Sequence, residues 1–421
     1  MNLKSLLLKL LPLTLLPLLA APVLSSPAGM TAMTTAPAGT TPMSDEPGLA
    51  QPEPAPGASD PASPPAELDR VPIALLVDLN SGQVLYQKEA NRRFLPASIT
   101  KVMTLYTAFE MISRNQLNTS KQMPMSEQAF KQWHRVGSTM FLDRSMNITV
   151  NDLLLGIANI SANDACIVLG EGAAGSVPNW IALMNAEAGK IGMHDSHFGT
   201  PNGWMDEGET FVTAHDLAAL AGAMITEHPD LYHRYIGYET LTFNGITQHN
   251  HDPILGRLEG ADGIKTGFTN QAGYGFLGSA HRGGRRLVMV IAGADRGPDR
   301  AKAARALMDW GFSAFASQPL FKAGEVIGAA KVQGGASRRV SLIAPMAYAV
   351  VQPNGSAGAV TTKIVYEGPL EAPIAKGSTV AWLEVHSGNK TTSRVPLVAG
   401  EDVGRAGIFA RLRNGLLEPF S

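Results

Sequence analysis

The first strong pattern in the chain is a pair of apolar runs on either side of a short polar turn. The segment PIALLVDLNSGQVLYQKEA begins at Pro72, and its two runs flank Asn80-Ser81-Gly82. Valine, leucine and isoleucine are frequent in strands, and a glycine at the end of such a turn can adopt a positive φ angle. The pattern predicts a β-hairpin at the start of the folded region.

A helix with almost no polar face follows the hairpin. We expect it to run from Ser98 to Ile112. Its apolar positions are Val102, Met103, Leu105, Tyr106, Phe109 and Met111. A helix that is apolar all round is buried at the centre of a domain. Further helices are predicted over residues 151–188 and 213–226.

Strands return in the second half of the chain. GYGFLGSAHRGG and RRLVMVIAGA meet at a Gly-Gly turn and predict a second hairpin, and DRAKAARALMDWGFSAF predicts an amphipathic helix. This unit therefore begins and ends with strands and has helices in its middle. After Pro319, short apolar runs alternate with Gly, Pro and Asn turns, which is typical of a small all-β domain.

The first residues indicate where the protein acts. Residues 1–26 have a basic start, a leucine-rich stretch and then small residues, the pattern of a secretory signal peptide cleaved within residues 21–26. An uncleaved anchor is the alternative, although Pro12 and Pro17 disfavour a spanning helix. Residues 27–68 are rich in Pro, Ala, Gly, Ser and Thr and predict an extended linker. We expect an exported, periplasmic protein.

Length and composition narrow the function further. A chain of 421 residues, of which 45% are hydrophobic, can hold two domains with a sizeable core. The net charge of −2 gives no indication of a nucleic-acid partner. The single cysteine, Cys166, cannot form an internal disulfide, and its apolar surroundings predict a buried, inert thiol.

The buried helix carries two residues that fit nucleophilic catalysis. Ser98 and Lys101 are one turn apart, so their side chains lie on the same face of the helix. A serine hydroxyl needs a base within hydrogen-bond reach, and a lysine acts as that base only when it is neutral. Burial and a second cation nearby both lower a lysine pKa. A serine that caps the helix beside a solvated lysine is the plainer interpretation. It is disfavoured because a lysine on a helix that is apolar all round has little access to water.

Two further motifs follow in the same order that serine acyl-transfer enzymes use. Ser161-Ala162-Asn163 begins 63 residues after Ser98, and Lys265-Thr266-Gly267 begins 104 residues after Ser161. The three motifs together are the signature of penicillin-binding proteins and class A β-lactamases. From about residue 69 to about residue 400 the sequence resembles the low-molecular-mass penicillin-binding proteins, the serine-type D-Ala-D-Ala carboxypeptidases of peptidase family S11.

This resemblance implies an α+β fold. Residues 69–316 would form a serine β-lactamase/transpeptidase-like catalytic domain, in which helices and a helical cluster flank an antiparallel sheet, and residues 317–403 a small C-terminal all-β domain. It also implies a DD-carboxypeptidase that removes the terminal D-Ala from peptidoglycan pentapeptides during cell-wall synthesis. Neither a cofactor nor a metal is expected, and β-lactams would act as inhibitors.

The resemblance implies a role for each motif residue. Ser98 is the nucleophile, Lys101 its base and Ser161 a proton relay. Asn163 would hold Lys101 or the substrate backbone. The substrate carboxylate would bind Lys265 and Thr266, with Gly267 leaving room for the acyl chain. Phe268, where many relatives have histidine, would contribute a backbone N–H to the oxyanion hole, as would Ser98.

Three other functions compete with this interpretation. A DD-endopeptidase would use the same chemistry, and the sequence leaves it open. A class A-like β-lactamase needs a Glu-x-x-Leu-Asn loop between the second and third motifs, but this interval reads MHDSHFGTPNGWMDEGET. A non-catalytic cell-wall binding protein is disfavoured because the serines and lysines are all present.

Two segments invite a different interpretation. The histidines in HDSH (His194–His197) and HNHD (His249–Asp252) could bind a metal, but neither pair has a partner at structural-site spacing, so we interpret them as surface-loop residues. Residues 404–421 place several apolar side chains near one helical face, and we expect weak, reversible contact with the outer face of the inner membrane. A tail that packs on the β domain, or that has no fixed structure, is the alternative.

Overall fold

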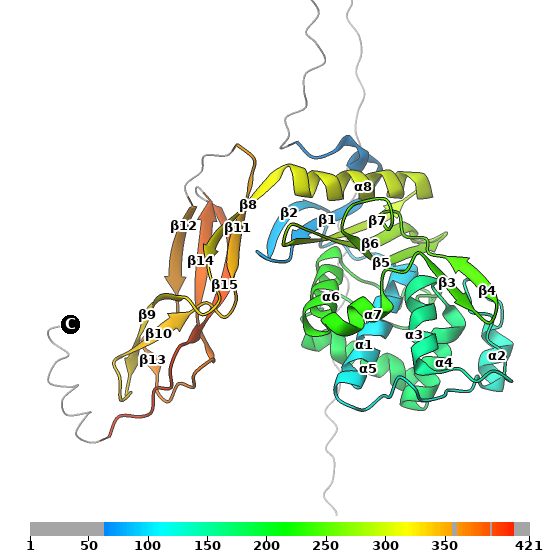
Figure 1. The fold of residues 1–421 in the computed structure, drawn as a ribbon, viewed down its shortest axis with the longest axis horizontal. Helices are drawn as coiled ribbons and strands as arrows, with labels where there is room; N and C mark the ends of the chain where they lie inside the picture. The colour runs from blue at the N-terminus through cyan, green and yellow to red at the C-terminus, as the bar shows by residue number, and fades with distance from the viewer. Residues whose placement is uncertain (1–62, 356–359, 388–389, 408–421) are drawn as a thin grey trace, which may run out of the picture. The chain divides into compact units, whose positions relative to one another are not determined.

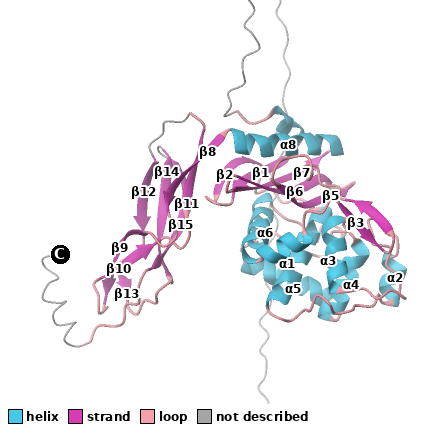
Figure 2. Ribbon diagram, viewed as in Figure 1, coloured by secondary structure: helices cyan, strands magenta, loops and turns pink. Residues whose placement is uncertain are grey.

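The structure is a computed structural model that describes residues 63–355, 360–387 and 390–407. The predicted signal peptide, the linker up to residue 62 and the tail from residue 408 lie outside the described residues. The described chain forms an α+β region followed by an all-β region, as the sequence predicts (Figures 1 and 2).

A five-stranded antiparallel sheet lies at the centre of the first region. Its strand order is β2-β1-β7-β6-β5. The strands are β1 (Ile73–Asp78), β2 (Gln83–Lys88), β5 (Ala261–Thr269), β6 (Gly273–Arg282) and β7 (Arg285–Ala294). Both predicted hairpins are confirmed: β1 pairs with β2, β6 pairs with β7, and Gly82 in the first turn has a φ of 67°.

The sheet separates two hydrophobic cores because successive strand residues point to opposite faces. In β1, Ile73 and Leu75 belong to the larger core, and Ala74 and Leu76 to the smaller one. Helix α8 (Gly297–Ser313) and the 3₁₀ helix η1 (Ala66–Arg70) cover the smaller core, and the remaining helices pack beneath the other face (Figure 1). These are η2 (Ala97–Thr100), α1 (Lys101–Ser113), α2 (Glu127–Trp133), α3 (Val150–Asn159), α4 (Asn163–Ala174), α5 (Val177–Lys190), α6 (Ala214–Glu227) and α7 (Pro229–Tyr235). A short hairpin, β3 (Thr240–Phe243) and β4 (Ile246–His249), lies beside them.

The all-apolar helix is confirmed as the buried centre of the helical cluster. Every residue of α1 from Lys101 to Phe109 is buried. Its expected start at Ser98 is wrong in one respect: the 3₁₀ turn η2 comes first, and the α-helix begins at Lys101. The single helical stretch expected over residues 151–188 divides into α3, α4 and α5, and the first break contains Ser161.

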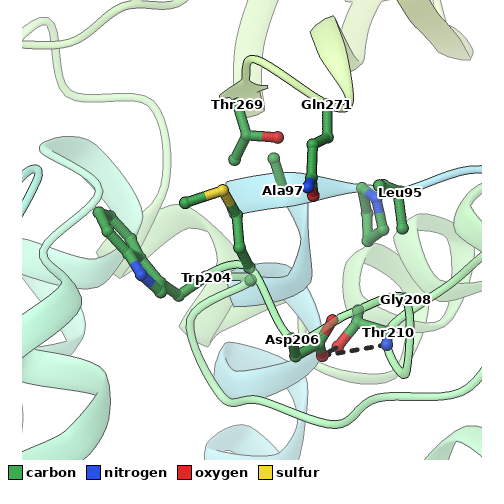
Figure 3. Close-up of a pocket in the computed structure, with 11 residues that line it drawn as sticks. Leu95, Ala97, Trp204, Asp206, Gly208, Thr210, Thr269 and Gln271 are labelled. Carbon is green, nitrogen blue, oxygen red and sulfur yellow. Dashed lines mark hydrogen bonds between the residues drawn. The ribbon is translucent and has the colours of Figure 1, made fainter.

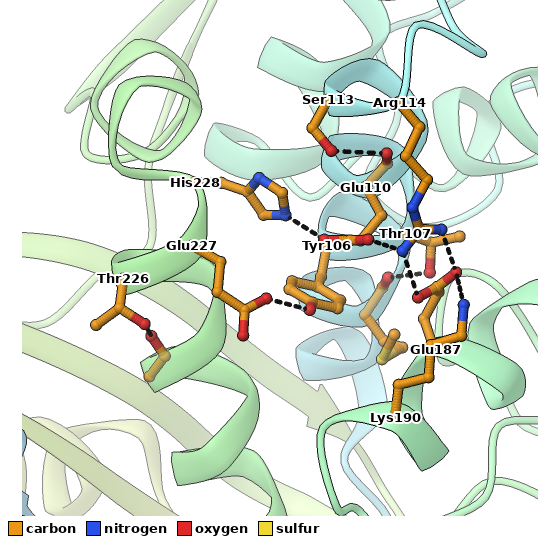
Figure 4. A network of polar contacts seen from close by, with 12 residues as sticks. Tyr106, Thr107, Glu110, Ser113, Arg114, Glu187, Lys190, Thr226, Glu227 and His228 are labelled. Carbon is orange, nitrogen blue, oxygen red and sulfur yellow. Dashed lines mark hydrogen bonds and ion pairs between the residues drawn. The ribbon is translucent and has the colours of Figure 1, made fainter. Parts of the chain in front are cut away.

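A network of polar contacts fixes the far end of α1 (Figure 4). Arg114 donates a hydrogen bond of 2.7 Å to Glu187 on α5, and His228, which follows α6, lies 2.7 Å from Glu110. Tyr106 donates one of 2.7 Å to Glu227 on α6. Charged hydrogen bonds that are partly shielded from water are stronger than exposed ones. The helix that carries Lys101 is therefore held at the end opposite to Lys101.

The C-terminal region is an all-β domain with its own core. Its strands are β8 (Phe315–Phe321), β9 (Val326–Gln333), β10 (Arg339–Ile343), β11 (Tyr348–Pro353), β12 (Val360–Val365), β13 (Leu370–Glu371), β14 (Thr379–Ser387) and β15 (Lys390–Ala399). A six-stranded sheet of order β12-β14-β15-β10-β9-β13 and the pair β11-β8 surround buried residues such as Leu342, Val350 and Leu383. The first strand begins at Phe315, ahead of Pro319, where the sequence pattern changes.

Candidate active site

The turn before α1 brings Ser98 and Lys101 together. The Nζ of Lys101 donates hydrogen bonds to the Oγ of Ser98 at 2.9 Å, to the Oδ1 of Asn163 at 2.8 Å and to the carbonyl oxygen of Asn202 at 2.6 Å. Three acceptors from three segments hold the amine in one position. Ala97, directly before Ser98, has a φ of 47°, a left-handed conformation that costs a non-glycine residue energy.

Burial makes Lys101 a weaker cation than a solvated lysine. Its side chain is fully buried, and this burial lowers its pKa to about 8, against smaller opposing effects of Cys166 and Asp164. The expected burial is therefore confirmed. The expected effect of a second cation is seen at Lys265 rather than at Lys101. Burial first, and then the charge of Lys101, lower the pKa of Lys265 to about 7.

The second motif lies in the break between α3 and α4. Ser161 is 5% exposed and has a φ of 62°, again a left-handed conformation for a residue with a side chain. Asn163 begins α4, and its Nδ2 donates to the carbonyl of Val136 at 3.1 Å. The neighbouring Asp164 accepts from the backbone N–H of Met140 at 3.0 Å. The first turn of α4 is therefore bonded to the segment that contains Val136 and Met140.

The third motif forms the middle of the edge strand β5. Lys265 and Thr266 are buried there, and the Nζ of Lys265 donates to the carbonyl of Thr266 at 3.1 Å. A Cβ atom on Gly267 would lie 2.4 Å from the carbonyl oxygen of Pro96. The absent side chain thus lets the strand approach the turn that carries Ser98, a packing reason in addition to the predicted space for a substrate.

A cleft of about 320 Å³ joins the three motifs. Its lining comes from η2, the second motif, β5, β6 and α8, and comprises Ser98, Ser138, Ser161, His251, Thr266, Gly267, Phe268, Tyr274 and Arg300. Lys101, Asn163 and Lys265 are buried and do not line it. Lys101 reaches the cleft through its hydrogen bond to Ser98.

Several residues of this site could not be identified from motifs. The Nε of Arg300 in α8 is buried, and no described residue accepts a hydrogen bond from it. His251 belongs to the HNHD stretch that was interpreted as a surface loop; its side chain is exposed, but it lines the cleft, and partial burial lowers its pKa. Asn202 acts through its backbone carbonyl, for which side-chain identity gives no signal.

A smaller hollow is bordered by Ala97, the residue before Ser98 (Figure 3). It is bordered by Ala97, Trp204, Thr269 and Gln271, among others, and its volume of about 20 Å³ suits a water molecule rather than a peptide group. Gly203 borders it too. A Cβ there would lie 1.8 Å from the carbonyl oxygen of Ala97, so this position also requires glycine.

The described residues contain one group that could hold a metal ion, namely Glu110, Glu227 and His228. Glu110 is twelve residues beyond Ser98, about 18 Å along a helix at the usual rise. This group is therefore no part of the cleft. The thiol of Cys166 is fully buried and its pKa is raised to about 12, chiefly by burial, which makes it a poor nucleophile.

Comparisons with known proteins agree with this geometry. The family described as D-alanyl-D-alanine carboxypeptidase matches residues 63–296, and the family described as the C-terminal domain of penicillin-binding protein 5 matches residues 315–405. The D-alanyl-D-alanine carboxypeptidase DacD of Salmonella typhimurium is 34% identical over 343 residues, which cover 80% of this chain and 87% of that protein.

Solved structures give the same result for the fold. Penicillin-binding protein 5 from Haemophilus influenzae superposes with a TM-score of 0.72 at 30% identity, over 82% of this chain and 99% of that one. Penicillin-binding protein D2 from Listeria monocytogenes, in its ampicillin-bound form, superposes with a TM-score of 0.52 at 29% identity, over 58% of this chain and 97% of that one. In the described part of this chain, no helix is long and apolar enough to cross a membrane.

Proposed function

The chain belongs to the D-alanyl-D-alanine carboxypeptidase family, and from that premise we propose that it releases the terminal D-Ala of peptidoglycan pentapeptides through an acyl-enzyme on Ser98. One observation carries the proposal. A fully buried lysine with a lowered pKa lies 2.9 Å from a serine hydroxyl that opens into a cleft. A buried amine without this chemistry would be a costly feature to maintain.

Acylation begins when neutral Lys101 takes the proton of Ser98. The serine oxygen attacks the carbonyl carbon of the penultimate D-Ala, and the C–N bond to the terminal D-Ala breaks. The leaving amine receives a proton from Lys101, and Ser161, which lines the cleft, is our candidate for the relay. Asn163 and Asn202 keep the amine of Lys101 directed at Ser98 throughout.

Charge that develops on the carbonyl oxygen needs donors that are already in place. The backbone N–H groups of Ser98 and Phe268 are our candidates, because both residues line the same cleft and Gly267 allows their segments to approach. The substrate carboxylate would bind where Thr266 and Arg300 line the cleft and Lys265 is buried next to Thr266 in the same strand. An arginine with a buried donor that lacks a protein partner is suited to an anionic ligand.

Deacylation returns the enzyme to its first state. Once the free D-Ala has left, water enters the vacated side of the cleft and attacks the ester carbon. Lys101 accepts a proton from that water, the bond to the Oγ of Ser98 breaks, and the serine regains its proton. The product is a peptide shortened by one residue, so both half-reactions balance without any added reductant or cofactor.

Export and β-lactam binding belong to the same proposal. The amino-terminal pattern of the sequence fits a signal peptide, and peptidoglycan lies outside the cytoplasm of the cell. A penicillin has a strained amide next to a carboxylate, so it offers Ser98 the same two features as the peptide. The resemblance to an ampicillin-bound penicillin-binding protein supports this part.

The test is mass spectrometry of the pure protein before and after benzylpenicillin, together with an assay for free D-Ala from a pentapeptide. We expect one covalent adduct on the tryptic peptide that contains Ser98, and catalytic D-Ala release. Ser98→Ala should abolish both. Cleavage of crosslinked dimers without D-Ala release would favour the endopeptidase, and rapid penicillin hydrolysis without D-Ala release would favour the β-lactamase.

A further inference from the structure

One wall of the cleft is a column of three side chains from three elements: Phe268 in β5, Tyr274 in β6 and Arg300 in α8. Phe268 and Tyr274 are directly opposite each other in the strand register. Their rings stack with centroids 4.1 Å apart at an angle of 27°. The guanidinium carbon of Arg300 lies 6.0 Å from the centroid of the Tyr274 ring, on the limit of a cation–π contact.

The ring of Tyr274 is the aromatic group that the Arg300 guanidinium faces. No described residue accepts a hydrogen bond from the Nε of Arg300, although that atom is buried. Asp252 is the acidic residue that acts on it electrostatically, yet no ion pair within 4.0 Å joins the two among the described residues. A free arginine side chain has many rotamers, and ordering it costs conformational entropy. Packing against a fixed ring reduces that freedom before a ligand arrives.

Tyr274 is itself fixed from two sides. The stacked ring of Phe268 covers it on the strand side. On the helix side, a Cβ on Gly297 would lie 3.2 Å from the Cε1 of Tyr274, so the first residue of α8 packs closely on this ring. Phe268 itself is 46% exposed, which is unusual for a large apolar side chain that only fills space. Tyr274, in the middle of the column, is therefore packed on two sides, while Phe268 is partly exposed to solvent.

We propose that Phe268 and Tyr274 are positioning residues that hold the Arg300 guanidinium ready for the terminal carboxylate of the substrate, and that they thereby set the preference for a free C-terminus over an internal or amidated peptide bond. The proposal rests on the proposed function. A guanidinium pairs with a carboxylate through two parallel hydrogen bonds, so a small change in its orientation weakens both. The nucleophile and its base are on other elements and do not depend on the column.

The experiment compares two probes, an N-acetylated tripeptide that ends in D-Ala-D-Ala and the same tripeptide with a C-terminal amide. Steady-state constants are measured for wild type, Tyr274→Leu, Tyr274→Phe and Arg300→Gln. We expect Tyr274→Leu and Arg300→Gln to lower kcat/KM for the free acid by about tenfold, mainly through KM, because the carboxylate contact is lost. The amide should change by less than about twofold in both variants, since it lacks the carboxylate. Tyr274→Phe keeps the ring and should resemble wild type.

Tyr86→Leu is the matched control. Tyr86 also packs an aromatic ring on α8, with its centroid 6.2 Å from that of Trp310, but it does not line the cleft. It should leave the acid-to-amide ratio of kcat/KM unchanged. If Tyr274→Leu does not fold, as judged by circular dichroism, Phe268→Leu replaces it, with the same pattern expected at about threefold.

Three results would overturn the proposal: equal losses on acid and amide, no loss in Tyr274→Leu, or a loss in Tyr274→Phe as large as in Tyr274→Leu. The proposed function fails in a different way, because the wild type would then release no D-Ala from the free acid. The two failures are therefore distinguishable in one data set.

Discussion

The amine of Lys101 and the hydroxyl of Ser98 are 2.9 Å apart, and the lysine reaches this position from the first residue of a helix that is buried along two and a half turns. The 3₁₀ turn that precedes the helix places Ser98 in the lining of the cleft, while Lys101 is buried and does not line it. The same backbone therefore exposes the nucleophile and desolvates the base. Replacing Ser98 should remove the nucleophile and leave the buried amine, and replacing Lys101 should remove the base and leave the serine.

Lys101→Arg should abolish acylation by benzylpenicillin while the protein still folds. Arginine keeps the positive charge but remains protonated at all accessible pH values, so it cannot accept the proton of Ser98. We expect the acylation rate to fall at least about a thousandfold, as for the loss of an essential general base. The measurement is adduct formation over time by mass spectrometry, with circular dichroism to check the fold. Lys131→Arg, on the exposed surface of α2, should acylate like wild type; a comparable rate for Lys101→Arg would show that Lys101 is not the base.

The two lysines predict a bell-shaped pH profile. Lys101 is active when neutral, so the rate rises as pH increases through its pKa of about 8. In the proposed mechanism Lys265 binds the carboxylate when protonated, so binding should weaken as pH increases through its pKa of about 7. The profile of kcat/KM reports the free enzyme, and its maximum should lie between these two values. KM alone should rise above a pH of about 7. A KM that stays constant from neutral to alkaline pH would separate Lys265 from carboxylate binding.

Much of this site could be predicted because its residues come in short local patterns. Spacing on one helix face relates Ser98 to Lys101, and the apolar sequence around them indicates that the lysine is buried. The hairpins and the β domain follow from alternating apolar residues and glycine turns. The 3₁₀ start of α1 was missed, because a run of apolar residues has the same appearance in either kind of helix.

The remaining site residues reach the cleft through the tertiary fold alone. Arg300 is one of two arginines in an amphipathic helix, and only the packing of α8 on the sheet brings it to the cleft. His251 lies in a polar loop that resembles any exposed loop. Asn202 contributes a backbone carbonyl, which any residue type could supply. No spacing rule connects Asn202, His251 and Arg300 with Ser98. Any two of these four residues are separated by 49 to 202 positions along the chain.

Gly203 provides a test of how tightly the nucleophile turn is packed. Gly203→Ala would place a Cβ 1.8 Å from the carbonyl oxygen of Ala97, so the turn that carries Ser98 must move. Gly192→Ala is the matched control, because Gly192 also has a left-handed φ, but has nothing within 4 Å of its added Cβ. Both variants pay a backbone cost of about 1 kcal/mol. In urea unfolding we expect Gly203→Ala, but not Gly192→Ala, to lose a further ~2 kcal/mol of unfolding free energy. Only Gly203→Ala should also lose acylation by penicillin. Equal stability of the two variants would mean that the turn adapts without strain.

After acylation, penicillin and the peptide should behave differently. With the peptide, the leaving D-Ala diffuses away and water enters from the side that it occupied. With penicillin, the leaving nitrogen remains tethered and obstructs that approach. A class A β-lactamase overcomes the obstruction with a glutamate that positions water, but none of the described residues lining this cleft carries a carboxylate. The penicilloyl-enzyme should therefore accumulate and turn over slowly, while a peptide that ends in D-Ala-D-Ala is hydrolysed repeatedly. The adduct mass followed over hours, alongside D-Ala release, checks both halves; rapid multiple turnover of penicillin would mean that some other group activates water in this cleft.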